Sequence, residues 1–164
     1  MPRYRRDRTY GGTWFFTVCL RDRTSDLLTR EIELLRQSVR QTRARMPFDI
    51  RCWVVLPDHM HCILTLPNGD NDYPNRWKSM KGRFSRALPD RAKWQSQARR
   101  PREKGIWQNR YWEHRIRDHA DFQSHLRYCY SNPVKHGLVA RPEDWPYSSL
   151  GRDLEKGLVT PDLW

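Results

Sequence analysis

The sequence predicts an α+β fold, a ferredoxin-like antiparallel sheet with helices packed mainly on one of its faces. Strand-like and helix-like segments follow one another in the order β-α-β-β-α-β-α. The two central strands are separated by a short connection at Pro57 and Asp58, which favours an antiparallel pair. At 164 residues the chain is long enough to enclose a core of its own. We therefore expect one domain over residues 1–150, followed by a C-terminal tail over residues 151–164.

The first part of the chain predicts two strands on either side of a long helix. Residues Gly12–Leu20 are aromatic and β-branched and follow a glycine, as is typical of a strand. Residues Thr24–Arg45 carry apolar side chains at helical spacing, and Pro47 follows them. Residues Phe48–Leu56 are again rich in apolar and β-branched side chains, so they predict the second strand.

The third strand carries two histidines one residue apart. Successive side chains of a strand point to opposite faces, so Met60 and Cys62 share an apolar face. His59 and His61 share the other face. The apolar face can pack on a core, while the two imidazoles point together at something else. This geometry suits a metal ion held by two nitrogens.

The second half predicts two further helices and a fourth strand. Residues Arg76–Leu88 predict a strongly basic helix, and Pro89–Gly105 predict a basic loop without apolar periodicity. Residues Ile106–Ile116 predict the fourth strand. A last helix begins at the cap residue Asp118 and runs towards Asn132, where the following proline ends it.

The charge balance points to a polyanionic partner. The chain has 31 Lys and Arg against 19 Asp and Glu, a formal net charge of +12. Nucleic acid is the first candidate for so basic a protein. Eight Trp and seven Tyr are also present, and aromatic side chains among arginines suit the stacking of unpaired bases.

The cysteines indicate a reducing compartment. Cys19, Cys52, Cys62 and Cys129 form no C-x-x-C pair and lie in apolar or strand-like contexts, so we expect buried free thiols. The sequence shows neither a cleavable signal peptide nor a stretch long enough to span a membrane. We expect a cytoplasmic protein.

The last predicted helix has two separable faces. Phe122, Leu126 and Cys129 form an apolar face, and a second stripe consists of Asp121, His125, Tyr128 and Asn132. Cap chemistry at the helix end would also explain a tyrosine four residues before an asparagine. Beside the two histidines, however, Asn132 could add an oxygen ligand to a divalent ion. Tyr128 would then lie next to a polarised phosphate as a nucleophile.

Several sequence blocks carry a resemblance to a known family. The block "PDHMHC" is similar to the HUH motif, histidine–hydrophobic–histidine, of single-tyrosine nucleases and transposases. Together with "GGTWFFTVCL", "IWQNRYWEHRIRD", "YCYSNPVKHGLV" and "DWPYSSL", it resembles the REP-associated tyrosine transposases in sequence and order, from Tyr4 to about Arg152. The H-x-H pair alone is a weak signal, but five blocks in order are specific.

The resemblance implies an HUH nuclease fold and a metal-dependent DNA-cleaving enzyme. By this resemblance His59 and His61 hold Mg²⁺ or Mn²⁺ and Asn132 completes the site, where related insertion-sequence enzymes more often have Gln. Tyr128 attacks single-stranded DNA and becomes joined to the 5′-phosphate, which allows later strand rejoining. The family acts in bacteria on REP elements, palindromic repeats folded as hairpins, and its members have been described as monomers. Tyr130 is the rival nucleophile, but it points away from Asn132 on a helix.

We expect DNA to contact basic residues in three segments. These are the N-terminus, the second helix and the basic loop, with the candidates Arg3, Arg5, Arg6, Arg76, Lys78, Lys81, Arg83, Arg86, Arg99, Arg100, Arg102 and Lys104. If several of them neutralise phosphates, binding should weaken steeply with salt.

Three other function classes would require different residues at these positions or give the same residues a different role. Histidine-triad hydrolases need a third histidine on the same strand face, where this chain has Ile63. A metal-dependent ribonuclease on the same fold would use Tyr128 only for positioning. A non-catalytic hairpin DNA- or RNA-binding protein would have no reason to keep His59, His61, Tyr128 and Asn132 together.

Overall fold

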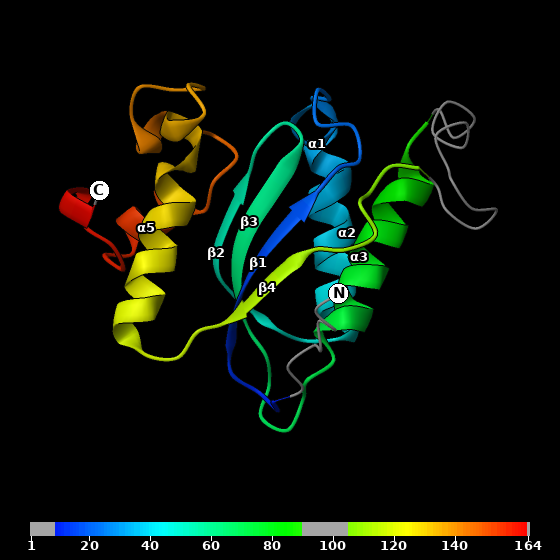
Figure 1. Ribbon diagram of the computed structural model, residues 1–164, viewed down its shortest axis with the longest axis horizontal. Coiled ribbons are helices and arrows are strands. Elements are labelled where there is room, and N and C mark those ends of the chain that lie inside the picture. The colour runs from blue at the N-terminus through cyan, green and yellow to red at the C-terminus, as the bar shows by residue number, and fades with distance from the viewer. Residues whose placement is uncertain (1–8, 90–104, 164) are drawn as a thin grey trace, which may run out of the picture.

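The sheet is four-stranded and antiparallel, as the sequence predicts. The computed structural model describes residues 9–89 and 105–163 of the chain. Every neighbouring pair of strands is antiparallel, in the order β2-β3-β1-β4 (Figure 1). The strands are β1 (Thr13–Cys19), β2 (Asp49–Val55), β3 (His59–Thr65) and β4 (Trp112–Arg115). The predicted fold class is therefore confirmed.

Helices lie on both faces of this sheet (Figure 1). On one face lie α1 (Leu27–Arg30), α2 (Ile32–Arg45) and α3 (Tyr73–Ala87). The long helix α5 (His119–Lys135) packs on the other face, over β2 and β3. The expectation that helices gather mainly on one face thus describes α1, α2 and α3, while α5 adds a second layer. The reason is that β3 is buried on both sides, and Phe15 and Ile63 form an apolar patch on the α5 side that needs its own cover.

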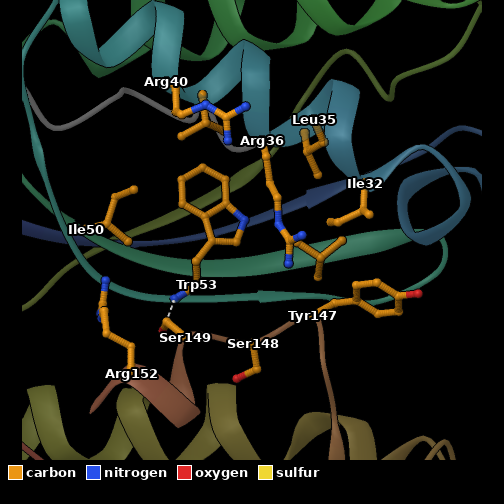
Figure 2. Close-up of a pocket in the computed structure, with 12 residues that line it drawn as sticks. Ile32, Leu35, Arg36, Arg40, Ile50, Trp53, Tyr147, Ser148, Ser149 and Arg152 are labelled. Atoms are coloured by element: carbon orange, nitrogen blue, oxygen red, sulfur yellow. Dashed lines mark hydrogen bonds between the residues drawn. The ribbon is translucent and has the colours of Figure 1, made fainter. Parts of the chain in front are cut away.

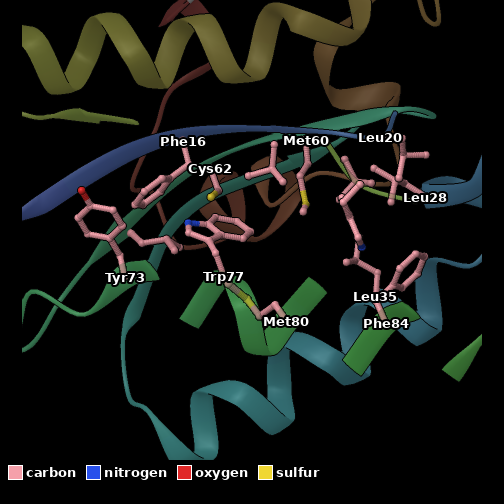
Figure 3. Close-up of a cluster of buried hydrophobic side chains, with 14 of the residues drawn as sticks. Phe16, Leu20, Leu28, Leu35, Met60, Cys62, Tyr73, Trp77, Met80 and Phe84 are labelled. Carbon is pink, nitrogen blue, oxygen red and sulfur yellow. The ribbon is translucent and has the colours of Figure 1, made fainter. Parts of the chain in front are cut away.

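The first core lies between the sheet and the pair α2 and α3. Alternate residues of β1, such as Trp14 and Phe16, point into it and meet Trp77 and Phe84 of α3 (Figure 3). The predicted apolar face of β3 is confirmed, because Met60, Cys62 and Leu64 belong to the same cluster. Burial of each such large side chain contributes about 1.5–3 kcal/mol.

The second core lies between the sheet and α5. Phe15 of β1 and Ile63 of β3 contact a cluster that includes Leu126 and Cys129 of α5. Buried residues that follow α5 complete it, among them Leu150 and Val159. All four cysteines are free, as predicted, and Cys52, Cys62 and Cys129 are buried.

The C-terminal segment is structured and packs on α5. It contains the short helices η1 (Pro142–Asp144), α6 (Leu150–Glu155) and η2 (Pro161–Leu163). The Tyr130 hydroxyl donates to the Asp153 carboxylate, and Trp145 Nε1 donates to the Val55 carbonyl oxygen at 2.9 Å. These bonds connect α5, α6 and the edge of the sheet, so residues on both sides of position 150 contribute to one core.

Three predicted element boundaries differ from the structure. The predicted helix Thr24–Arg45 is divided at Glu31 into α1 and α2, and the predicted strand Ile106–Ile116 is strand only at Trp112–Arg115. The prediction that Pro133 ends the last helix is wrong, since α5 continues to Lys135. Pro133 lacks an N–H donor, but the helical bonds continue after it, because the His136 N–H bonds the Asn132 carbonyl at 2.9 Å. Asp118 is the N-cap, as predicted, and accepts from Asp121 N at 2.8 Å.

No helix in residues 9–89 and 105–163 has both the length and the apolar character that crossing a membrane requires.

Replacement of Trp77 tests the first core. Trp77 is 1% exposed and contacts Phe16 and Trp53, so Trp77→Ala leaves a large cavity. We expect the free energy of unfolding to fall by about 3–5 kcal/mol, measured by urea denaturation. Tyr10→Ala, at a side chain that is 69% exposed, is the control and should change stability little. Equal losses in both variants would contradict this description of the core.

Candidate active site

The two histidines of β3 lie side by side on the face that α5 covers. Their ring centroids are 5.0 Å apart, and the residues are only 4% and 2% exposed for His59 and His61. Burial, aided by neighbouring His59, lowers the pKa of His61 to about 3. Burial also lowers the pKa of His59, although Asp58 opposes this effect. Both imidazoles are therefore neutral near pH 7, the form in which nitrogen can bind a metal.

Hydrogen bonds orient both rings from their Nδ1 atoms. His59 Nδ1 lies 2.7 Å from Asp58 Oδ1, and since a carboxylate only accepts, Nδ1 carries the proton. His61 Nδ1 lies 2.8 Å from Thr17 Oγ1 on the neighbouring strand. Arg23 Nε in turn donates to Asp58 Oδ2 at 2.5 Å. These partners leave the Nε2 edges of the two rings free to bind, the arrangement by which outer partners orient metal-binding histidines.

Two buried polar atoms at this site have no hydrogen-bond partner among the described residues. They are His61 Nε2 and Asn132 Oδ1, on a strand and a helix that pack together. The Asn132 amide donates through Nδ2 to the Tyr128 carbonyl oxygen at 3.3 Å, which directs Oδ1 elsewhere. Each unsatisfied atom costs about 1–3 kcal/mol. Asn132 Oδ1 is an acceptor, and His61 Nε2 is one when the ring proton is on Nδ1 and is donated to Thr17 Oγ1. In that tautomer the two atoms fit a cation, so the residues present suit the expected divalent metal.

Tyr128 lies beside this pair and is accessible. Its ring centroid is 5.1 Å from that of His61, and the residue is 41% exposed. Lys135 Nζ lies 5.5 Å from the same ring, which places a positive charge where a phosphate could approach. Tyr130, in contrast, is 1% exposed, and its hydroxyl donates a hydrogen bond to the Asp153 carboxylate. Helical spacing predicts this separation, and it leaves Tyr128 as the accessible phenol.

A second group of potential metal ligands lies between β4 and the first turns of α5. One ligand atom from each of His114, Asp121 and His125 falls within 4.8 Å of the others. These atoms bind one another, with His114 Nε2 at 2.9 Å and His125 Nδ1 at 3.0 Å from the Asp121 carboxylate. The Arg117 backbone N–H also donates to this carboxylate at 2.9 Å. Because the Asp121 carboxylate already has these hydrogen-bond partners, we interpret the three residues as a polar contact that joins β4 to α5.

The predicted DNA-contacting residues fall into three groups: one is buried, four lie on α3, and the others lie outside the described residues. Arg76 is 2% exposed and bonds Asp70 and the Pro47 carbonyl oxygen, so it stabilises the fold and offers no surface charge. That prediction is corrected: positive charge in the sequence does not distinguish a buried ion pair from a surface. Lys78, Lys81, Arg83 and Arg86 remain on α3, across the sheet from the histidines. Arg3, Arg5, Arg6, Arg99, Arg100, Arg102 and Lys104 lie outside the described residues.

Sequence reasoning missed several residues that contact the site, among them His136, whose ring centroid is 5.1 Å from that of His59. Thr17, Arg23, Asp58 and Lys135 touch a histidine, its carboxylate partner or Tyr128. Asp58 could have been found from its place next to His59 in the motif. Thr17 could be found only from the register of β1 on β3, which a single sequence does not specify.

A cavity of about 240 Å³ lies elsewhere, at the edge of β2. Figure 2 shows Trp53 between the arginines of α2, Arg36 and Arg40, and the segment that contains Ser148 and Ser149. Trp53 contacts Trp77 of the first core, so the cavity is on the α2 side of the sheet. It is therefore separate from the histidines and Tyr128.

An antiparallel sheet that presents an H-x-H pair to an accessible tyrosine on a packed helix is the arrangement of the tyrosine transposases. No family model matches the chain. A REP-associated tyrosine transposase of Escherichia coli K12 is 46% identical over 162 residues, which are 99% of this chain and 90% of that protein. The chain belongs to the REP-associated tyrosine transposase family.

Two further comparisons agree with this assignment. A relative from Haemophilus influenzae is 46% identical over 165 residues, which cover 100% of this chain and 93% of the relative. A solved structure of a REP-associated tyrosine transposase bound to a REP hairpin is 46% identical and has a TM-score of 0.86. That match covers 100% of this chain and 91% of the other. The resemblance seen in the five sequence blocks is confirmed.

The polar contact between β4 and α5 predicts a pH-dependent stability. Burial raises the pKa of Asp121, but the hydrogen bonds from His114 and Arg117 lower it by more than burial raises it. The pKa of Asp121 therefore lies below its usual value. The ionised carboxylate therefore stabilises the fold above pH 4, and this contribution is lost as the pH falls below about 4. We expect Asp121→Asn to lose about 1–3 kcal/mol at pH 7 and less at pH 3, measured by urea denaturation.

The control for this prediction is Asp26→Asn. Asp26 forms an exposed ion pair with Arg30, so the exchange should change stability little at either pH. An equal loss for Asp121→Asn at pH 7 and pH 3 would show that the carboxylate charge is not the stabilising feature.

Proposed function

We propose that this protein is a metal-dependent single-stranded DNA endonuclease and transposase that acts on REP hairpins through Tyr128. The observation that carries the proposal is the pair of unpartnered buried acceptors, His61 Nε2 and Asn132 Oδ1, next to an accessible tyrosine. The related protein whose structure holds a REP hairpin supports the choice of substrate. We also propose that it acts as a monomer, as the sequence resemblance implies.

His59, His61 and Asn132 would hold Mg²⁺ or Mn²⁺, which would supply Lewis-acid polarisation of the phosphate. Tyr128 supplies the nucleophile: its oxygen forms a bond to phosphorus and its proton passes to solvent. The bond from phosphorus to the 3′-oxygen breaks, and that oxygen takes a proton to become a free 3′-hydroxyl. The ammonium group of Lys135 lies close enough to the ring to attract the same phosphate.

The covalent step conserves the phosphodiester bond energy. One phosphate ester replaces another, so a 3′-hydroxyl can attack the phosphotyrosine and release Tyr128 without a high-energy cofactor. This reversibility suits strand transfer and rejoining. The alternative is a protein that binds hairpins without cutting them, and this alternative predicts no covalent product.

The first test is capture of the covalent intermediate. A hairpin with a single-stranded extension is labelled at its 3′ end, incubated with Mn²⁺ and resolved on a denaturing protein gel. We expect a labelled protein band that disappears in Tyr128→Phe and with chelator, and cleavage that falls on the order of a thousandfold or more. Tyr130→Phe is the matched control, because that phenol is buried against Asp153, and it should keep the band.

Other results would assign other functions. Cleavage without an adduct would indicate a hydrolytic nuclease, and tight hairpin binding without cleavage would support the binding protein. An adduct that survives Tyr128→Phe but not Tyr130→Phe would show that Tyr130, and not Tyr128, is the nucleophile.

The second test measures the metal directly, without DNA. Titration with Mn²⁺, followed by the electron paramagnetic resonance signal of the free ion, should show one site. We expect His61→Ala and Asn132→Ala to weaken binding about tenfold or more. His114→Ala, in the other histidine cluster, should leave the affinity unchanged. If His114→Ala removed binding instead, the metal site would belong to the cluster of His114, Asp121 and His125.

A further inference from the structure

We propose that Trp112 forms a subsite on which an unpaired DNA base stacks, beside the phosphate that Tyr128 attacks. This inference rests on the proposed function. It begins from the exposure of Trp112, which is 61%. Trp14, Trp77 and Trp107 are buried, and Trp112 is the one large exposed indole in residues 9–89 and 105–163. An exposed indole at the edge of a sheet contributes nothing to either core.

Strand register places Trp112 in line with the histidines. Thr17 of β1 pairs with His61 on one side and with Trp112 on the other. Directly paired residues of a sheet point to the same face, and Thr17 Oγ1 confirms this by its contact with His61 Nδ1. Neighbouring strands are about 4.8 Å apart. Trp112 is therefore about 10 Å across the sheet from His61, on the same face.

The flanking residues of β4 confirm the direction of the Trp112 side chain. Glu113 accepts from the Tyr73 hydroxyl at 3.2 Å, so it points to the α3 side. His114 stacks on His125 of α5, with ring centroids 4.6 Å apart, so it points to the α5 side. Side chains alternate along a strand, and Trp112 consequently shares the α5 side with His114.

The same face remains open where Trp112 lies. The first turns of α5 meet β4 at His114, and the helix packs over β2 and β3, on the opposite side of β1 from Trp112. The Tyr128 ring contacts Phe15 of β1 and His61 of β3, with centroids 5.9 Å and 5.1 Å away. Tyr128 and Trp112 thus flank β1 from two sides. A strand of DNA held by its phosphate at Tyr128 can lay an adjacent base on Trp112.

The chemistry of the indole specifies the ligand. A base in a duplex has both faces covered by its neighbours, so only an unpaired base can stack on a protein side chain. Stacking on an indole needs no particular base, because every base has a π-face. The subsite therefore selects single-stranded DNA at the cleavage position and does not read its sequence.

The experiment measures binding apart from cleavage. Fluorescence anisotropy of a labelled hairpin with an unpaired extension is recorded with Tyr128→Phe and with Tyr128→Phe combined with Trp112→Ala. We expect the second exchange to weaken binding between about fivefold and a hundredfold, the range for loss of one stacked base. Trp112→Phe should retain most of the affinity. Tyr10→Ala, at an equally exposed aromatic outside this row, should change nothing.

An abasic scan then locates the base. In the Tyr128→Phe protein, removal of one base next to the cleavage position should weaken binding as much as Trp112→Ala does. In the double variant the same abasic DNA should bind no more weakly than intact DNA. Unchanged affinity of the double variant, or an abasic effect that persists in full without Trp112, would overturn the proposal. Thermal unfolding should be unchanged, since Trp112 is exposed.

The two proposals fail separately. If the wild-type protein forms no phosphotyrosine but Trp112→Ala still weakens binding, the stacking subsite stands and the cleavage function falls. If the adduct forms and Trp112→Ala changes neither binding nor adduct yield, the subsite alone is refuted.

Discussion

The structure depends on the pairing of β1 with β3, two central strands that are buried on both faces. This register puts Trp14 and Phe16 into the core beneath α3 and, at the same time, places Thr17 opposite His61. A slip by one residue would exchange the two faces of β1, and with them the core and the site. The apolar core therefore specifies the position of the catalytic candidates, although none of them contributes to that core.

Burial has a second effect at the histidines. Loss of water around His61 favours its neutral form, and the Thr17 contact orients the ring. When the ring proton is on Nδ1, the lone pair of Nε2 is available to a metal ion. An unsatisfied buried atom weakens the fold by about 1–3 kcal/mol. Two such atoms of the described residues, on His61 and Asn132, lie at the same place. Such a local loss of stability is understandable where binding of a ligand restores it.

Much of the fold and part of the site could be predicted from the sequence, for a physical reason. The two-residue period of a strand separates His59 and His61 from Met60 and Cys62, and the helical period separates Tyr128 from Tyr130. Both rules act within one element. Contacts between elements follow from register and packing, which is why Thr17 was missed and why Arg76 was assigned to DNA. The length of α5 was underestimated because packing outweighs the local effect of Pro133.

The position of the nucleophile is set by bonds at several points along α5. The Asp121 cluster ties the first turn of the helix to β4, and Tyr130 ties its later part to Asp153 of α6. Between these points Tyr128 lies on the same stripe of the helix as Asp121, away from Tyr130, and its ring packs edge-on against Phe15. A residue that reacts in line with a phosphate must keep its place to within a fraction of an ångström. The histidine cluster at the start of α5 therefore has a structural explanation, as an anchor for the helix that carries Tyr128.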